Sequence, residues 1–191
     1  MLTIYMLKNE VEEFLKEKGE FMQIDYLNNN LKLMPPIEMR KFAYIKLAEI
    51  YNKKKMFAES AKAYRNVAMN STIFREKIKY FIEEAKEYIR KGEFIDADKA
   101  IKRALTESTI DQRKQITKEI IIFYKEIAQE LENGLKRNQA SRIYEKILKF
   151  DLSEQEKLEI KEKLKKLYEK LPKKFSLIDI IHLLDKNPKW I

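Results

Sequence analysis

The sequence of 191 residues contains no cysteine, which excludes disulfide bonds, thiolate metal ligands and a cysteine nucleophile. It contains only three glycines, too few to build a glycine-rich phosphate-binding loop. Its one histidine, His182, lies among isoleucine and leucine residues. A lone imidazole cannot assemble a metal site, so we interpret His182 as a structural or surface residue. The sequence therefore predicts no metal and no cofactor.

Long hydrophobic runs are also missing. A membrane-spanning helix needs about 20 consecutive apolar residues, whereas the longest run here, residues 120–124, has five. The first seven residues are apolar but lack the basic leader and small-residue cleavage site of a signal peptide. We therefore expect a soluble, cytoplasmic protein with no membrane span.

Residue patterns typical of catalysis are not found. The sequence shows no Ser-His-Asp arrangement and no Glu-x-x-His pair of the kind that di-iron helical bundles use. Adjacent carboxylates occur at Glu12 and Glu13 and at Glu83 and Glu84, but neighbours on a helix point in different directions. We interpret these four carboxylates as solvated surface charges and expect the protein not to be an enzyme.

What the sequence does contain is a helical hairpin, clearest over residues 41–69. Two helices with apolar residues at i, i+3, i+4 and i+7 are separated by a basic turn at 52–55. The apolar positions are Tyr44, Leu47, Ala48 and Tyr51 in the first helix, and Ala61, Tyr64, Val67 and Ala68 in the second.

The hairpin pattern recurs along the chain. Equivalent first-helix positions are Glu12, Ala48, Ala85, Ala128 and Lys165, which are 36, 37, 43 and 37 residues apart. The turn sequence Lys-Gly-Glu-Phe occurs twice, at 18–21 and at 91–94, in phase with the helices. A two-helix unit with a period in the thirties indicates a helical solenoid, with a plain helical bundle as the alternative.

The predicted fold is all-α, with about ten helices in about five antiparallel hairpins. The hairpins span residues 3–36, 37–70, 71–107, 109–151 and 153–186, in a single domain over 1–186 followed by a C-terminal tail at 187–191. Capping residues predict where several helices begin, because Ser or Thr followed by an acid or amide three residues later closes a helix N-terminus. The predicted caps are Ser71 or Thr72, Thr109 with Gln112, Ser153 with Glu156, and Ser176 with Asp179.

The repeated residues resemble the tetratricopeptide repeat family. The matching positions are Pro36, Tyr44, Leu47, Ala48, Tyr51 and Tyr64, together with Ala97 and Ala104. The chain departs from the family in its longer spacing, in Glu84 at a leucine position, and in Glu12 and Lys165 at small-residue positions. The resemblance implies a right-handed α-solenoid, similar to tetratricopeptide and SNAP-type adaptor folds. It implies a non-enzymatic scaffold or adaptor that holds a peptide or helix of another protein on its concave face.

In that family the first helix of each hairpin lines the concave surface. The resemblance therefore implies a partner-binding groove lined by Phe42, Ile45, Glu49, Lys79, Ile82, Lys86, Arg90, Ile122, Lys125 and Gln129. A mixed apolar and basic groove suits an acidic peptide or amphipathic helix. Family members that bind chaperone tails hold a C-terminal carboxylate at the positions of Ile45 and Glu49, so we do not expect chaperone binding here.

The net charge of +9 is unevenly distributed. Residues 41–70 hold seven basic and two acidic residues, a net charge of +5, and residues 111–150 hold nine and six, a net charge of +3. A basic field favours acidic partners, such as nucleic acid, an acidic peptide or a membrane surface. The alternative function is therefore an RNA-binding helical repeat, and the simplest alternative is that lysine is abundant on exposed helix faces.

Overall fold

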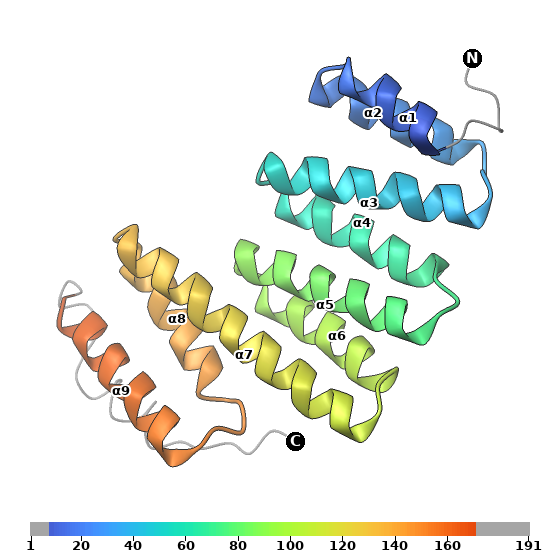
Figure 1. Cartoon of the computed structure of the whole chain (residues 1–191). Coiled ribbons are helices and arrows are strands. Elements are labelled where there is room, and N and C mark those ends of the chain that lie inside the picture. The colour runs from blue at the N-terminus through green and yellow to red at the C-terminus, as the bar shows by residue number, and fades with distance from the viewer. Residues whose placement is uncertain (1–7, 171–191) are drawn as a thin grey trace. The chain divides into compact units, whose positions relative to one another are not determined.

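A computed structural model describes residues 8–170 of the chain. Within that range the chain forms nine α-helices and no strands, which confirms the all-α class (Figure 1). The helices are α1 (Lys8–Lys16), α2 (Glu20–Lys32), α3 (Ile37–Lys53), α4 (Phe57–Asn70), α5 (Phe74–Lys91), α6 (Phe94–Thr106), α7 (Ile110–Asn133), α8 (Arg137–Ile147) and α9 (Glu154–Glu169). The predictions for His182, for a helix beginning at Ser176 and for the tail at 187–191 lie outside the described residues.

The chain divides into two compact units, unit 1 over 1–116 and unit 2 over 117–191, with the boundary inside α7. The prediction of a single domain over 1–186 stays a prediction.

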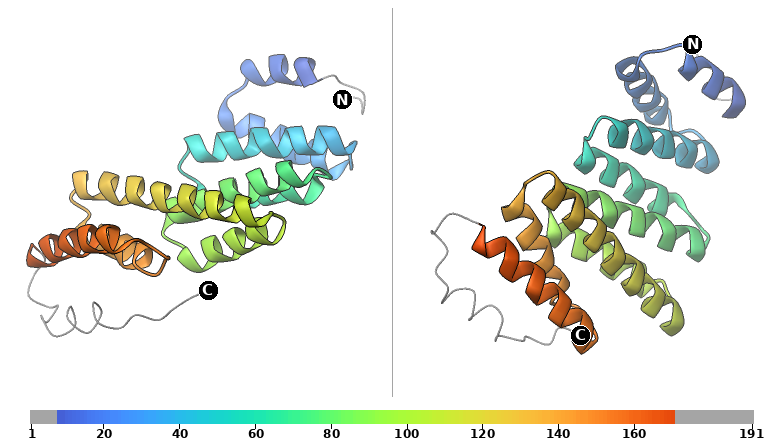
Figure 2. Two further views of the ribbon diagram at one scale, coloured as in Figure 1. Left: turned by 60° about the horizontal axis from the view of Figure 1, so that its bottom comes forward. Right: turned by 60° about the vertical axis from the view of Figure 1, so that its left-hand side comes forward.

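Consecutive helices of unit 1 pack against one another from α2 to α6. Alanines are fully buried where helix backbones approach closely, and large apolar side chains fill the spaces between them. These alanines are Ala48, Ala61, Ala68, Ala85, Ala97, Ala100 and Ala104. The connections α1–α2, α3–α4 and α5–α6 lie along one edge of unit 1, and α2–α3, α4–α5 and α6–α7 lie along the opposite edge (Figure 2).

Polar contacts join the first helix of one hairpin to the next hairpin at a nearly constant sequence separation. The Lys41 ammonium lies 2.8 Å from a carboxylate oxygen of Glu76, and the partners are 35 residues apart. Asn52 donates to Glu87 at 2.6 Å, again across 35 residues. These contacts place α3 beside α5 within unit 1.

Two of the predicted helix caps are confirmed. The Thr109 amide donates to the Gln112 side chain at 2.9 Å while the Gln112 amide donates to the Thr109 hydroxyl at 3.4 Å. Ser153 and Glu156 form the equivalent reciprocal pair at the start of α9. Reciprocal bonding of this kind satisfies two otherwise unpaired amides.

The predicted cap at Ser71 or Thr72 is wrong. Ile73 is the N-cap residue of α5, and no side chain caps that helix. The Ser71 hydroxyl instead donates to the Val67 carbonyl at 2.9 Å. That bond closes the last turn of α4.

In unit 2, α8 packs against α9. The later part of α7 contacts α8 through the Tyr144 hydroxyl, which donates to Glu132 at 2.5 Å. The rings of Tyr124 and Phe150 lie 5.8 Å apart. The core of the unit includes the fully buried side chains of Tyr124, Tyr144 and Ile120.

Candidate partner-binding surface

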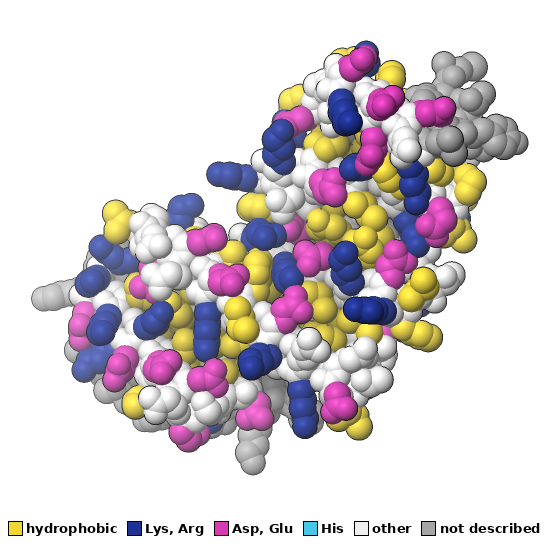
Figure 3. Space-filling model, in the orientation of Figure 1, with side chains coloured by type: hydrophobic (Ala, Val, Ile, Leu, Met, Phe, Trp, Pro, Cys, Tyr) yellow, Lys and Arg dark blue, Asp and Glu magenta, His cyan; other side chains and the backbone are white. Residues whose placement is uncertain are grey.

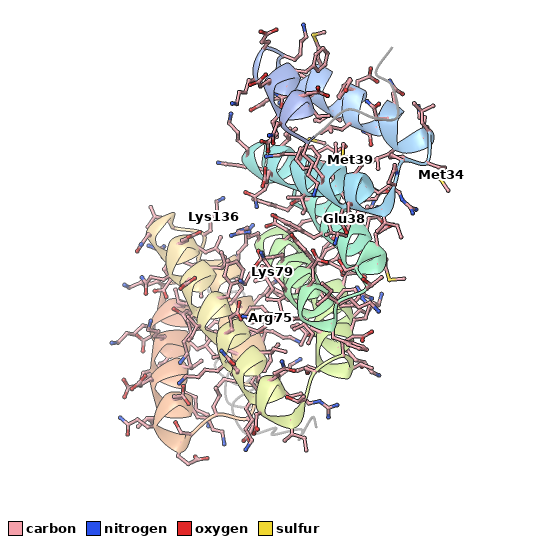
Figure 4. The ribbon with its side chains drawn as sticks, turned by 45° about the vertical axis from the view of Figure 1, so that its right-hand side comes forward. Met34, Glu38, Met39, Arg75, Lys79 and Lys136 are labelled. Carbon is pink, nitrogen blue, oxygen red and sulfur yellow. The ribbon has the colours of Figure 1, made fainter. Side chains whose placement is uncertain are left out.

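Seven of the ten predicted groove residues lie on α3 and α5, and six of these seven form the candidate surface. They are Phe42, Ile45 and Glu49 of α3 and Lys79, Lys86 and Arg90 of α5, and we call this set the α3–α5 surface. Spacings of three, four and seven residues place the members from each helix on one stripe of that helix. Figure 3 shows this face of unit 1, where hydrophobic side chains lie among charged groups of both signs. Figure 4 shows Lys79 with Arg75 in the first turns of α5.

Two tyrosines lie between the helices of this surface. The ring of Tyr64, on α4, stacks on that of Tyr80, on α5, with 6.1 Å between the centroids. Burial, reinforced by the charges of Glu83, Glu87 and Glu49, raises the pKa of Tyr64 to about 12. The phenol therefore stays neutral and presents an apolar ring with a polar edge, an arrangement common where proteins bind other proteins.

The charged members of the surface already have partners within unit 1. Lys86 donates to Glu83 at 3.0 Å, and Arg90 donates to Glu87. Lys79 lies over the Tyr80 ring, 5.3 Å from its centroid. Ion pairing offsets part of the positive field that Lys86 and Arg90 present to a partner.

The apolar members of the surface are partly accessible. Phe42 packs against the core formed by α1, α2, α3 and α4, and the Lys46 ammonium lies 5.6 Å from the centre of its ring. Ile45 is half-buried, as is Phe42. Ile82 differs, since only 7% of its surface is exposed. We therefore assign Ile82 to the packing of unit 1 and leave it out of the α3–α5 surface.

The last three predicted groove residues lie on α7 in unit 2. Ile122 is exposed. The Lys125 ammonium lies 3.1 Å from Glu156, and the Gln129 side chain accepts a hydrogen bond from Lys163 at 3.4 Å. Both polar residues thus join α7 to α9, which gives them a structural role in unit 2.

The interpretation of Glu83 and Glu84 as solvated surface charges is wrong for Glu84. Its side chain is 0% exposed and accepts hydrogen bonds from Arg65 of α4 at 2.9 Å and Arg103 of α6 at 2.7 Å. Burial raises the pKa of Glu84, and the hydrogen bonds from the two guanidinium groups oppose that rise. The signal in the sequence was a glutamate at a position where the repeat pattern calls for leucine.

Glu87, one turn beyond Glu84, is a second buried carboxylate that the sequence did not identify. It accepts from Asn52 and Arg90, and burial raises its pKa. One oxygen of Glu84 and one of Glu87 have no hydrogen-bond partner. The helix α5 is therefore held by polar contacts to α3, α4 and α6 as well as by apolar packing.

Much of the basic excess of residues 41–70 is neutralised by neighbouring segments. Five of its seven basic residues form ion pairs with carboxylates that lie outside residues 41–70. The pairs are Lys41–Glu76, Lys46–Glu12, Lys53–Glu20, Lys54–Glu20 and Arg65–Glu84. The net charge of +5 therefore overstates the positive field that this segment presents to a partner.

The described part of the chain contains no group of three or more histidine or acidic side chains placed to hold a metal ion. None of its helices is long and apolar enough to cross a membrane. Residues 8–116 present a surface of aromatic, aliphatic and paired charged side chains, which suits the binding of a peptide or helix.

Comparisons with protein-family models, with curated proteins and with solved structures found no match to this chain.

Proposed function

We propose that the chain is a tetratricopeptide-like right-handed α-solenoid that acts as a non-enzymatic adaptor. Its α3–α5 surface binds a peptide or an amphipathic helix of another protein. Apolar side chains of the partner contact Phe42 and Ile45, and its carboxylates lie near Lys79 and Arg90. This use of the surface follows the helix-in-groove mode of recognition.

The observation that carries the proposal is the repeated polar contact between hairpins. The contacts Lys41–Glu76, Asn52–Glu87 and Lys54–Glu20 join residues 35, 35 and 34 positions apart. A nearly constant separation supports a stack of successive hairpins, because equivalent segments of neighbouring repeats contact each other in a solenoid. Such stacking leaves one face of each first helix for a partner.

Nucleic acid is the rival partner, because the chain carries a net charge of +9. The pairing of Lys41, Lys46, Lys53 and Lys54 with carboxylates favours a protein instead. Phosphate-backbone binding depends on cations that can replace condensed counterions, and a lysine held in an ion pair is less able to do so.

The test is a pull-down from a cell extract, followed by mass spectrometry, with Lys79→Glu/Lys86→Glu as the surface variant. The control is Lys62→Glu/Lys102→Glu, which makes the same charge change at exposed lysines of α4 and α6. We expect the native chain and the control to recover the same proteins and the surface variant to lose them. Equal recovery by all three would reject the α3–α5 surface, and nuclease-sensitive recovery would favour nucleic acid.

A further inference from the structure

A pocket of about 190 Å³ lies in unit 2, between the α7–α8 turn and the C-terminal half of α9. We call it the α9 pocket. It is lined by Glu132, Leu135, Arg137, Lys163, Lys166, Leu167 and Lys170. Four of these seven residues are basic and one is acidic. Lys136, labelled in Figure 4, marks the turn that forms one wall of this pocket.

Three of the four cations have no acidic partner. Among residues 8–170, Arg137, Lys166 and Lys170 form no ion pair and no side-chain hydrogen bond. They differ in this from Lys86 and Lys125, which are bound to carboxylates. Cations that are gathered around one concavity and have no ion-pair partner among residues 8–170 attract anions.

The single acidic residue of the pocket is already engaged. Glu132 accepts a hydrogen bond from the Tyr144 hydroxyl at 2.5 Å, and Lys163 donates to that hydroxyl oxygen at 3.3 Å. This chain of hydrogen bonds fixes Lys163 and Glu132 against α8. The remaining cations, at Arg137, Lys166 and Lys170, are left to face a ligand.

Three of the cations follow one another along one side of the pocket. Lys163 and Lys166 lie on α9 and Lys170 is its C-cap residue, so the backbone that carries them extends over about 10 Å, at 1.5 Å per residue. Carboxylates spaced along a peptide suit such a row, because side chains two residues apart on an extended strand are about 7 Å apart.

The pocket also has an apolar side. Leu167 forms part of the core of unit 2, and Leu135 is 72% exposed to solvent. Leu135 has a φ of 58°, in the left-handed region where a branched side chain is strained. The exposed Leu135 side chain therefore provides an apolar contact surface for one side chain of a ligand.

We infer that the α9 pocket binds an acidic segment of a partner protein, with two or more carboxylates on Arg137, Lys166 and Lys170 and an apolar side chain against Leu135. This inference rests on the proposed function only in taking the partner to be a protein. It assigns a second contact site, in the unit that does not contain the α3–α5 surface.

The probe for the test is a fluorescein-labelled peptide of eight residues, Glu-Glu-Leu-Glu-Glu-Leu-Glu-Glu, amidated at its C-terminus so that only side-chain carboxylates remain. Binding to the full-length chain is followed by fluorescence anisotropy at low salt. The same peptide with glutamine in place of glutamate, and a labelled single-stranded RNA of eight nucleotides, serve as comparison ligands. We expect the acidic peptide to bind more tightly than either.

The pocket variant is Arg137→Glu/Lys166→Glu, and its matched control is Lys161→Glu/Lys165→Glu, which makes the same charge change elsewhere on unit 2. We expect the pocket variant to weaken peptide binding at least about tenfold and the control to change it less than about threefold. Equal weakening by both variants, tighter binding of the RNA, or no binding of the acidic peptide would each overturn the inference.

Leu135→Gly separates binding from folding. Glycine adopts positive φ readily, so this variant is expected to melt at an equal or higher temperature than the native chain. The variant removes the apolar side chain that contacts the peptide, so we expect peptide affinity to fall about fivefold. Unchanged affinity would overturn the role given to Leu135. Lys79→Glu/Lys86→Glu should leave peptide binding intact, so failure of the α3–α5 surface and failure of the α9 pocket give different results.

Discussion

The sequence Lys-Gly-Glu-Phe forms two different turns in this chain. At 91–94, α5 continues to Lys91, and Gly92 ends it in the left-handed conformation with a φ of 82°. At 18–21, α1 has already ended at Lys16, and Gly19 precedes α2 with a φ of −65°. Both turns lie on the same edge of unit 1 (Figure 1).

The difference comes from how the last carbonyls of the preceding helix are satisfied. In the second copy the Gly92 and Glu93 amides donate to carbonyls of α5 at 3.0 and 2.9 Å, as in a left-handed helix cap. In the first copy the Gln23 side chain donates to the carbonyls of Leu15 and Lys18 at 2.7 and 2.8 Å. The position equivalent to Gln23 in the second copy is Asp96, whose carboxylate has no hydrogen to donate.

Four identical residues therefore do not determine the turn. In the first copy the Gln23 side chain adds two hydrogen bonds to one from the Lys18 amide to the Leu15 carbonyl at 3.1 Å, whereas the second copy uses backbone amides. The first helices of the two hairpins also differ. The helix α5 carries the buried Glu84 where α1 has Val11, and α1 carries the half-exposed Glu12 where α5 has Ala85. Variants at these positions measure how much each difference contributes.

The largest effect is expected at Glu84. Glu84→Ala removes the buried acceptor of the hydrogen bonds from Arg65 and Arg103 and leaves a cavity, so we expect a loss of about 2–3 kcal/mol in unfolding free energy. The comparison change Glu12→Ala, at a side chain 41% exposed and bound to Lys46, should cost clearly less. Urea denaturation measures both, and equal losses would contradict the assignment of Glu84 as a buried link.

The same carboxylates control how stability depends on pH. Burial raises the pKa of Glu84 and Glu87 in the folded chain above the ordinary 4.5, so the folded state holds more protons there than the unfolded state. Unfolding free energy is therefore expected to fall as pH rises from 4.5 through the raised pKa values. Glu12 acts in the opposite direction, because the hydrogen bond from Lys46 lowers its pKa and its contribution is lost as pH falls.

Glu84→Gln/Glu87→Gln should flatten the fall in stability as pH rises above 4.5, measured by urea denaturation at each pH. Glu12→Gln is the control and should leave that fall in place. A native pH profile that rises over this range would contradict the raised pKa values.

A smaller effect is expected at the two glycines. Gly92→Ala forces alanine into the left-handed region, so we expect a cost of about 1–2 kcal/mol. Gly19→Ala places alanine at an ordinary φ with no atom within 4 Å of the new Cβ, so its cost should stay below about 0.5 kcal/mol. Thermal melting of the two variants compares them directly, and equal shifts would show that the two turns are alike.

The smallest effect is expected at Gln23. Gln23→Ala removes two hydrogen bonds that end α1, at a partly buried site, so we expect a loss of about 0.5–1 kcal/mol. Hydrogen exchange should locate the loss in the last turn of α1. Faster exchange spread evenly over α3 and α4 would instead assign Gln23 to the packing of the whole unit.

Helix positions were predicted well from the sequence where a local signal was strong. The start of α3 at Ile37 after Pro36, the capping pair of Thr109 with Gln112 and the stop of α7 at Asn133 all follow from residues next to the helix end. The prediction that Ser71 caps α5 was wrong because a serine hydroxyl between two helices can bond to either of them. Which helix it serves depends on the geometry of both, and the sequence does not contain that geometry.

The candidate surface was predicted less completely. Spacing placed Phe42, Ile45 and Glu49 on one stripe, but it could not show that Ile82 is covered or that Lys125 is bound to Glu156. The α9 pocket was missed for a related reason. Its residues come from the α7–α8 turn and from α9, and periodicity within one helix does not reveal contacts between different elements.

The ion pairs between successive hairpins have a consequence for how such a chain can evolve. The cations of residues 41–70 are matched to Glu12, Glu20, Glu76 and Glu84, which belong to the segments on either side. Duplicating, deleting or shuffling this segment would leave those charges without counterparts. The repeats of this chain are therefore not interchangeable modules. A substitution at a paired charge in one repeat restricts which substitutions the neighbouring repeat can accept.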